Sequence, residues 1–295
     1  MITRRNLMSA AGAVSLCAGR MAYGAVPAFR PERIEQAYEA FIRLIGSLSP
    51  GTVYESYSGV VFGVVPGAAA APLLRFQGIT KTVWSGLDGG GLRSRRYDVM
   101  VFSDYLTRSA VTAFKNPMTD WEVDVPVVAT GPESLDHSVE LMRVGRRAMY
   151  SPNNWQQSGA TLSHGYEVAF SYPHPLKPAV WPDASPGERG FSTIATTSEA
   201  PVQTLLDPNV DSARATRHWL NVTSWSPWLK LGQMPGSLAW RARGEKGVHV
   251  NELPEEIRAR VGREVPGFFE AQEPWSERRD EFQQYIQSQA PKPVA

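Results

Sequence analysis

The sequence predicts a mainly β protein, an antiparallel β-barrel or strongly curved sheet with flanking helices at its N- and C-terminal ends. Aromatic residues favour strands, and the 295 residues include nine Trp, ten Tyr and eleven Phe. Proline shortens helices, and the chain has 23 prolines. Between residues 52 and 128, β-branched and aromatic runs alternate with turn signals at short intervals, which is typical of a meander or barrel.

The first 24 residues resemble a twin-arginine export signal. Arg4 and Arg5 precede an apolar run that ends near Gly19, shorter than the roughly 20 apolar residues that a membrane anchor needs. The small residues Ala22 and Gly24 predict cleavage before Ala25. The resemblance implies the twin-arginine translocase as a partner during export, and a soluble periplasmic protein with no stable membrane anchor.

Two other interpretations of this segment are less favoured. A helix of the folded domain should show an amphipathic period, and the segment has none. A lipid anchor on Cys17 should follow a small residue, whereas Leu16 precedes it. Because Cys17 is the single cysteine, cleavage would leave a chain without a thiol nucleophile or a thiolate metal ligand.

Composition predicts one globular domain over residues 25–295. Lys and Arg total 30 against 29 Asp and Glu, and 42% of residues are hydrophobic. This balance argues against a basic nucleic-acid-binding protein and against a disordered acidic chain. No long linker, low-complexity block or repeat divides the remaining sequence.

The individual elements follow from periodicity and from turn residues. Pro31 opens a helix to Leu48, because apolar residues recur at intervals of three and four. Strands are expected over 52–65, 73–87, 92–106, 111–128 and 160–172, with a strand pair across 191–206 and two strands within 219–243. Further helices are expected at 136–144, 254–261 and 276–289, the last capped by Ser276.

Side-chain alternation assigns faces to two of these strands. Tyr97, Val99 and Val101 should share one face, with Asp98, Met100 and Phe102 on the other. The second strand should place Leu238, Trp240 and Ala242 opposite Arg241 and Arg243. Both faces of the first strand are largely apolar, so we expect this strand to be covered on both sides.

The well-known catalytic signatures are missing from the sequence. The chain has no nucleophile elbow and no phosphate-binding glycine loop, and Gly89-Gly90-Gly91 leads into a strand where a dinucleotide site needs a helix. No two of the five histidines have the spacing of helical metal ligands, so no metal ligands are assigned and the cofactor is left unknown. His164 and Glu167, three apart on a strand, should point to opposite faces.

Candidate functional residues come from polar groups within aromatic strands and turns. A neutral imidazole among aromatics can act as a base, which singles out His164 and His218, although most histidines taken alone are structural or at the surface. The candidate catalytic residues are Arg96, Asp98, Glu167, His164 and His218. The candidate ligand-binding residues are Asn116, Asn221, Trp225, Trp228 and Trp240.

Several of these segments together resemble the DUF1838 family of bacterial and fungal proteins of unknown function. The resemblance rests on 96–102, on Asn116-Pro117-Met118-Thr119, on 223–232 with its Ser-Trp-Ser-Pro-Trp core, and on 240–244. It extends over nearly all of the chain after the export signal. It implies neither a reaction nor a cofactor nor a catalytic residue.

The sequence favours a protein that binds a small apolar or aromatic molecule in a β-barrel cavity, or transforms it by general acid–base chemistry. Two alternatives stay open: a non-enzymatic binding or assembly factor whose aromatics are core residues, and a metal-assisted hydrolase or oxygenase. Trp225 and Trp228 could line the cavity or fill the core. The polar residues beside them favour the cavity, because a dry core tolerates polar groups only when each is paired.

Overall fold

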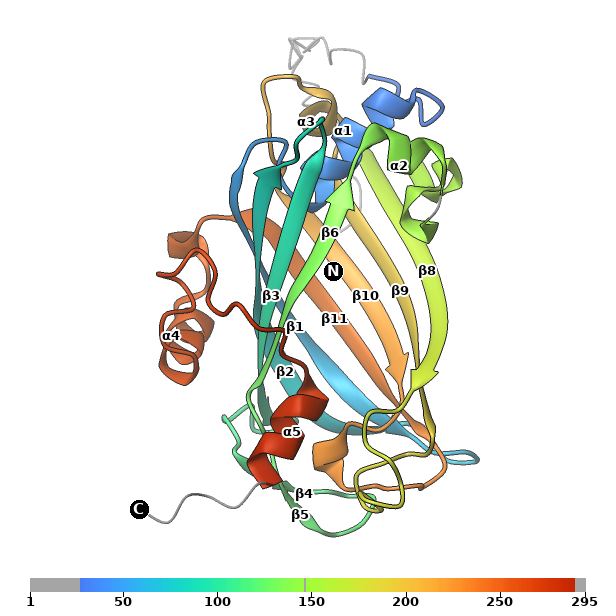
Figure 1. The fold of residues 1–295 in the computed structure, drawn as a ribbon, viewed down its shortest axis with the longest axis vertical. Coiled ribbons are helices and arrows are strands. Elements are labelled where there is room, and N and C mark those ends of the chain that lie inside the picture. The colour runs from blue at the N-terminus through green and yellow to red at the C-terminus, as the bar shows by residue number, and fades with distance from the viewer. Residues whose placement is uncertain (1–26, 146, 290–295) are drawn as a thin grey trace, which may run out of the picture.

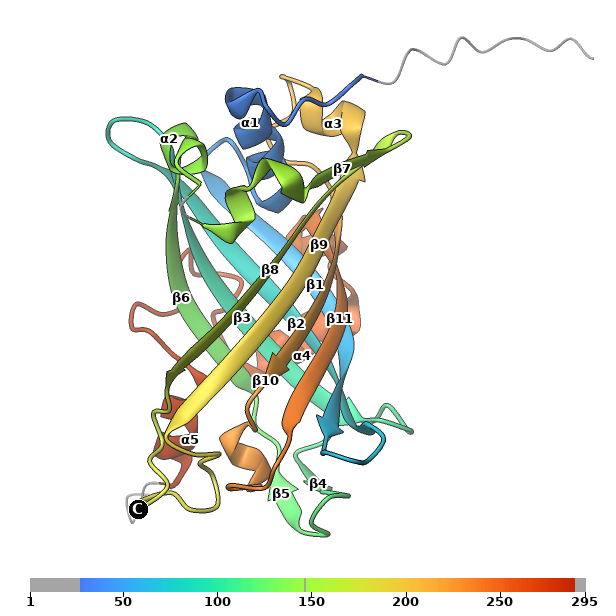
Figure 2. The ribbon, with the colours of Figure 1, turned by 90° about the vertical axis from the view of Figure 1, so that its right-hand side faces the viewer.

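Nine antiparallel strands form a single, strongly curled sheet in the order β6-β3-β2-β1-β11-β10-β9-β8-β7. The computed structural model describes residues 27–145 and 147–289, so the predicted export signal lies outside the described residues. Figures 1 and 2 show a half-barrel in which β6 and β8 approach from opposite sides. Within the described residues these two strands do not pair, so the sheet is strongly curved but open. The mainly β fold with flanking helices is confirmed.

Apart from the four-residue β7, the strands of the main sheet are long. They are β1 Gly51–Val64, β2 Ala71–Gly86, β3 Leu92–Asp104, β6 Val128–His137, β7 Trp155–Ser158, β8 Thr161–Pro173, β9 Arg189–Pro201, β10 Ala215–Thr223 and β11 Ser237–Val248. A separate hairpin joins β4 Ala113–Lys115 to β5 Glu122–Asp124. The helices are α1 Ile34–Ile45, α2 Val139–Arg143, α3 Val202–Leu206, α4 Glu255–Glu264 and α5 Glu281–Gln289.

The convex face of the sheet is partly covered by α4 and the segment that follows it. Tyr97, Val99 and Val101 of β3 are buried there against a cluster that includes Ile257 and Phe268. The predicted faces of β3 are confirmed, because Asp98 and Phe102 share the opposite, concave face with Tyr57 and Trp240. The lower half of the concave face holds the largest aromatic core, and α1 closes the upper end (Figure 2).

Three predicted elements differ from the structure. The expected strand pair across 191–206 is one strand, β9, followed by α3, because Pro201 lacks the N–H that would continue the ladder. The expected strand over 111–128 is reduced to two three-residue strands on either side of the turn at Asn116. The last helix begins at Glu281, where Asp280 caps it, while Arg279 bridges to Gly131 of β6 in extended form. Ser276 therefore caps no helix.

Candidate functional site

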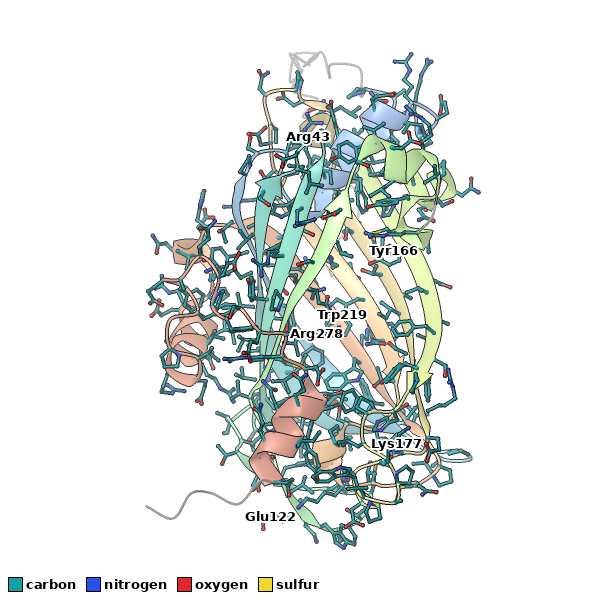
Figure 3. All side chains as sticks on the ribbon, in the orientation of Figure 1. Arg43, Glu122, Tyr166, Lys177, Trp219 and Arg278 are labelled. Carbon is teal, nitrogen blue, oxygen red and sulfur yellow. The ribbon has the colours of Figure 1, made fainter. Side chains whose placement is uncertain are left out.

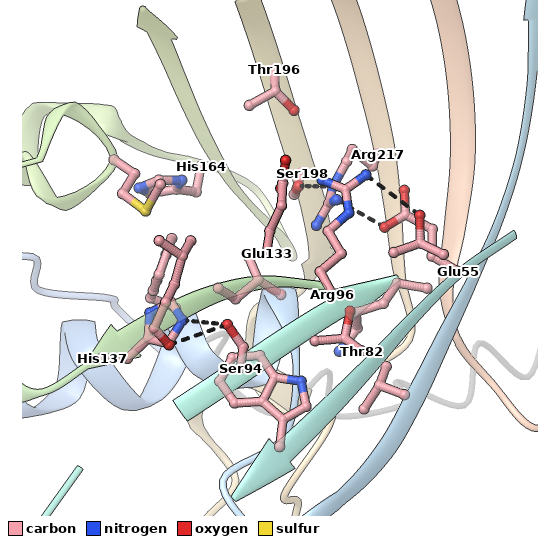
Figure 4. Close-up of a pocket in the computed structure, with 18 of the residues that line it drawn as sticks. Glu55, Thr82, Ser94, Arg96, Glu133, His137, His164, Thr196, Ser198 and Arg217 are labelled. Carbon is pink, nitrogen blue, oxygen red and sulfur yellow. Dashed lines mark hydrogen bonds and ion pairs between the residues drawn. The ribbon is translucent and has the colours of Figure 1, made fainter. Parts of the chain in front are cut away.

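The upper half of the concave face encloses a cavity of about 130 Å3. It lies between α1 and the upper ends of strands that are distant in sequence, and Figure 4 shows side chains entering it from both sides of the curled sheet. We refer to it as the concave cavity. Its lining includes Phe41, Trp84, His164 and Tyr166 together with Glu55, Arg96, Glu133, Arg217 and Lys246.

Aromatic rings form the wall of the concave cavity nearest to α1. The His164 ring lies 5.0 Å from Phe41 and 4.6 Å from Trp155, measured between ring centroids. Trp84 stacks at 5.2 Å on His137. These rings pack at ordinary aromatic distances, so this wall presents apolar faces to any molecule in the cavity.

His137 is held on both ring nitrogens. Its Nε2 lies 2.9 Å from Ser94 Oγ, and its Nδ1 lies 3.0 Å from the Tyr150 hydroxyl. Burial, reinforced by the charge of Arg147, lowers the pKa of His137 to about 4. At neutral pH this histidine is therefore an uncharged link between β3, β6 and the segment after α2.

His164 has one ring nitrogen without a partner. Burial lowers the pKa of His164 to about 4, and a hydrogen bond with the backbone of Met149 opposes that shift. Its Nε2 is buried and has no hydrogen-bond partner among the described residues, and the same holds for Trp84 Nε1. Buried polar atoms are normally paired; these two nitrogens are fully covered by the protein and do not open onto the cavity.

Asp98 anchors a polar network below the aromatic wall. Its carboxylate accepts hydrogen bonds from the Tyr57 hydroxyl at 2.5 Å and from Thr80 Oγ1 at 2.6 Å. Arg96 Nη2 donates to it at 3.3 Å. Burial and the nearby Asp98 charge raise the pKa of Tyr57 well above its ordinary value. Both oxygens of Asp98 are occupied, so this group positions its neighbours.

A second ion pair crosses the concave face between β1 and β10. Arg217 Nη1 lies 2.9 Å from Glu55 Oε2, and Arg217 Nε donates to Ser198 Oγ at 3.3 Å (Figure 4). Lys246 is the cross-strand neighbour of Glu55. Its Nζ donates to the carbonyls of Arg43 and Gly46 at 2.7 and 2.9 Å.

The electrostatics of Lys246 follow from its position. Burial, reinforced by Arg217 and opposed by Glu55, lowers the pKa of Lys246 to about 7. A third hydrogen bond joins its Nζ to Ser212 Oγ at 3.0 Å. Two of the three contacts tie the carboxyl end of α1 to the sheet and the third reaches the segment before β10, so Lys246 holds the roof of the cavity in place.

Arg96 and Glu133 form the charged pair of residues on the β3–β6 side of the cavity. They are opposite one another in the β3–β6 register, and both point into the space between the two sides of the sheet (Figure 4). The side chain of Arg96 is 45% exposed despite its contact with Asp98. Partial burial lowers the pKa of Arg96, but the charges of Asp98, Glu133 and Glu55 outweigh that effect and raise it. Arg96 therefore stays a cation with donors available to a ligand.

The structure brings together three of the five predicted catalytic residues. Arg96 and Asp98 share one network, and His164 lines the same cavity from β8. Glu167 is exposed on the outer face of β8, which confirms that His164 and Glu167 point to opposite faces. His218 lies on the convex face of β10, away from the concave cavity.

The predicted ligand-binding residues lie lower in the molecule. Asn116 is fully buried in the β4–β5 turn, where it accepts from Met118 N and donates to the Leu229 carbonyl at 3.4 Å. Asn221 accepts from Ser192 Oγ on the concave face. Trp225, Trp228 and Trp240 are buried in the lower core and do not line the concave cavity.

Sequence reasoning missed several cavity residues that belong to strands. They are Glu55, Glu133, Arg217, Lys246, Trp84 and His137. The sequence held a signal for two of them. In the side-chain alternation of their strands, Glu55 and Lys246 take inward positions, where a charged group is tolerated only when it has a partner. Their meeting depends on the β1–β11 pairing, which joins residues almost 200 positions apart.

The described residues contain no group of three or more His, Cys, Asp or Glu side chains placed to hold a metal ion. Among their helices, none has the length and apolar character of a membrane span.

Figure 3 shows Trp219 and Tyr166 on the concave side, with the opening of the half-barrel in front of them.

A comparison with curated proteins found no match. The model of one protein family, described as "Protein of unknown function (DUF1838)", matches residues 51–289. The match begins at β1 and ends with α5, so it includes the whole curled sheet and the strand residues that line the concave cavity, while α1 lies before it. The chain therefore belongs to the DUF1838 family.

Proposed function

We propose that this protein binds a small organic molecule with an aromatic or apolar ring in the concave cavity. The observation that carries the proposal is an aromatic wall that faces charged groups across one cavity. Arg96 and Glu133 both line this space, and within the described residues only Nη2 of Arg96 donates hydrogen bonds, to Asp98 and Thr80. Ligand pockets typically combine apolar walls with a few convergent polar groups in this way.

The size of the cavity limits the ligand. A volume of about 130 Å3 is close to that of an engineered cavity of about 150 Å3 that admits benzene. A single ring fits this space, with its faces against the aromatic wall. Polar substituents on the ring would reach Arg96 and Glu133 at the opening, where both side chains are exposed.

Binding agrees with the site better than acid–base catalysis does. A general base works best when its pKa is near the working pH, whereas burial lowers the pKa of His164 to about 4. Lys246, with its pKa lowered by burial to about 7, donates three hydrogen bonds within the protein. Neither group is free to shuttle protons at neutral pH.

The test is calorimetric titration with a panel of monocyclic aromatic compounds carrying hydroxyl, carboxyl or amide groups. Thr82→Phe should abolish binding, because Thr82 lines the cavity and the new ring would occupy it. Thr193→Phe is the matched control, since Thr193 is exposed on the outer face of β9. Equal affinity of Thr82→Phe and wild type for every bound compound would contradict a ligand in this cavity.

We propose further that the protein is exported by the twin-arginine route and acts in the periplasm. Replacing Arg4 and Arg5 with Lys should leave an uncleaved precursor in the cytoplasm, because the translocase recognises the paired arginines. The same double change at Arg30 and Arg33 should not affect export. Cell fractionation and immunoblotting measure both variants, and normal periplasmic yield of the Arg4/Arg5 variant would refute the route.

A further inference from the structure

The convex face carries a groove that the proposed ligand site does not use. It has a volume of about 630 Å3 and lies over β1, β2, β10 and β11, with Arg108 and Glu256 contributing from the β3–β4 loop and from α4. We refer to it as the convex groove. Its size falls within the range of about 300–1,000 Å3 seen for small-molecule sites.

Strand register places cations at regular positions in the convex groove. Arg75 and Arg241 flank Val60, which pairs with both of them across the sheet. Arg243 lies two residues along β11 from Arg241 and pairs with His218. Neighbouring strands are about 4.8 Å apart, so these three arginines lie around a floor formed by residues 58–60 of β1.

The positive charge of the convex groove is local and mostly unpaired. Four arginines line it, Arg75, Arg108, Arg241 and Arg243, against the single carboxylate of Glu256. Within the described residues, only Arg243 among these four forms an ion pair, a long and exposed one of 3.7 Å to Glu245. The whole chain has a formal net charge of only +1. The positive charge of the groove is therefore a local feature, offset by negative charge elsewhere in the chain.

One of the four arginines is held in place by the protein. Arg75 Nε donates to the Tyr105 carbonyl at 3.0 Å, and its guanidinium lies 5.3 Å from the centre of the Tyr105 ring. The remaining guanidinium nitrogens have no partner in the described structure. A planar guanidinium fixed in this way matches the geometry of phosphate and carboxylate oxygens.

We propose that the convex groove binds a small soluble anion carrying two or more phosphate or carboxylate groups. Several guanidinium groups around one floor suit a multivalent anion, since each anionic group can take a separate arginine. The walls formed by Arg108 and by Glu256 of α4 make the site concave, which suits a compact molecule better than a flat membrane surface. The site is separate from the concave cavity, from which the sheet divides it.

Calorimetry at low ionic strength with pyrophosphate and with citrate tests the proposal. At least one of these probes should bind wild type, and its affinity should fall as salt is added. Arg108→Gln and Arg241→Gln should each weaken binding by about tenfold. Both side chains are exposed, so neither change should affect folding. Arg278→Gln removes the same charge from an exposed position outside the groove (Figure 3) and should leave the affinity unchanged.

Several results would overturn the proposal. They are the absence of binding by both probes at millimolar concentration, equal affinity of wild type and the two groove variants, or an equal loss in Arg278→Gln. Sedimentation with phosphatidylglycerol vesicles without binding of either probe would also overturn it, in favour of a membrane surface. Thr82→Phe separates the two sites: it should leave pyrophosphate and citrate binding intact, and loss of anion binding in that variant would place the anion in the concave cavity.

Discussion

Replacing Trp225 with Ala should lower the free energy of unfolding by about 3–5 kcal/mol. The side chain is only 2% exposed and packs within the largest core cluster. Its Nε1 donates to the Met234 carbonyl at 2.8 Å, so truncation removes a hydrogen bond and leaves a cavity. The indole also fits closely against Gly236, which limits how far the chain can collapse around the gap.

Urea denaturation measures this loss beside two other tryptophans. Trp121→Ala is the matched control, since Trp121 is 55% exposed and its removal should change stability by less than about 0.5 kcal/mol. Trp228→Ala should fall between the two, because its ring is buried but its Nε1 has no hydrogen-bond partner among the described residues. A cost below about 1 kcal/mol at Trp225 would show that the lower core is not packed as described.

Acidification from pH 6.5 to pH 4 should destabilise the protein by about 3 kcal/mol for each of His137 and His164. In the folded protein, burial holds the pKa of both histidines at about 4. In the unfolded chain they bind protons near pH 6.5. Between these values the unfolded state binds more protons, so the stabilising contribution is present above pH 6.5 and is lost as the pH falls towards 4.

Carboxylates also titrate between pH 6.5 and 4. The test therefore compares how steeply the free energy of unfolding changes with pH in each variant. His164→Gln removes the proton that His164 takes up on unfolding, and the stability of the variant should therefore depend less on pH between 6.5 and 4. His218→Gln is the matched control on the exposed convex face and should follow the wild-type profile. Parallel profiles for wild type and His164→Gln would mean that His164 is not held neutral.

The elements that could be predicted are those whose signal is local. The period-two pattern of β3 and β11 correctly separated Tyr97, Val99 and Val101 from Asp98, and Trp240 from Arg241. The helical period after Pro31 predicted α1, whose buried face closes the upper end of the half-barrel. Errors occurred where a single residue ends or starts an element. The missing N–H of Pro201 ends β9, and the Asp280 cap starts α5. A pattern averaged over many residues does not show such single positions.

The candidate site could be predicted only in part, because strand pairing creates it. Arg96 and Asp98 lie two residues apart on one strand and were found together. Arg217 reaches Glu55 only after β10, β11 and β1 have assembled. The polar residues near Trp225 favoured a ligand wall, yet Ser224 Oγ bonds to Phe191 N, and Trp225 itself is paired. Local polarity there reflects satisfied core contacts.

The most direct test of ligand binding in the concave cavity is native mass spectrometry after incubation with a cellular small-molecule extract. Wild type and Thr193→Phe should both retain an added mass corresponding to a small organic molecule with a ring. Thr82→Phe should retain none, because its new side chain fills the cavity of about 130 Å3. An identical retained mass in all three proteins, or no retained mass in any of them, would contradict the proposed function.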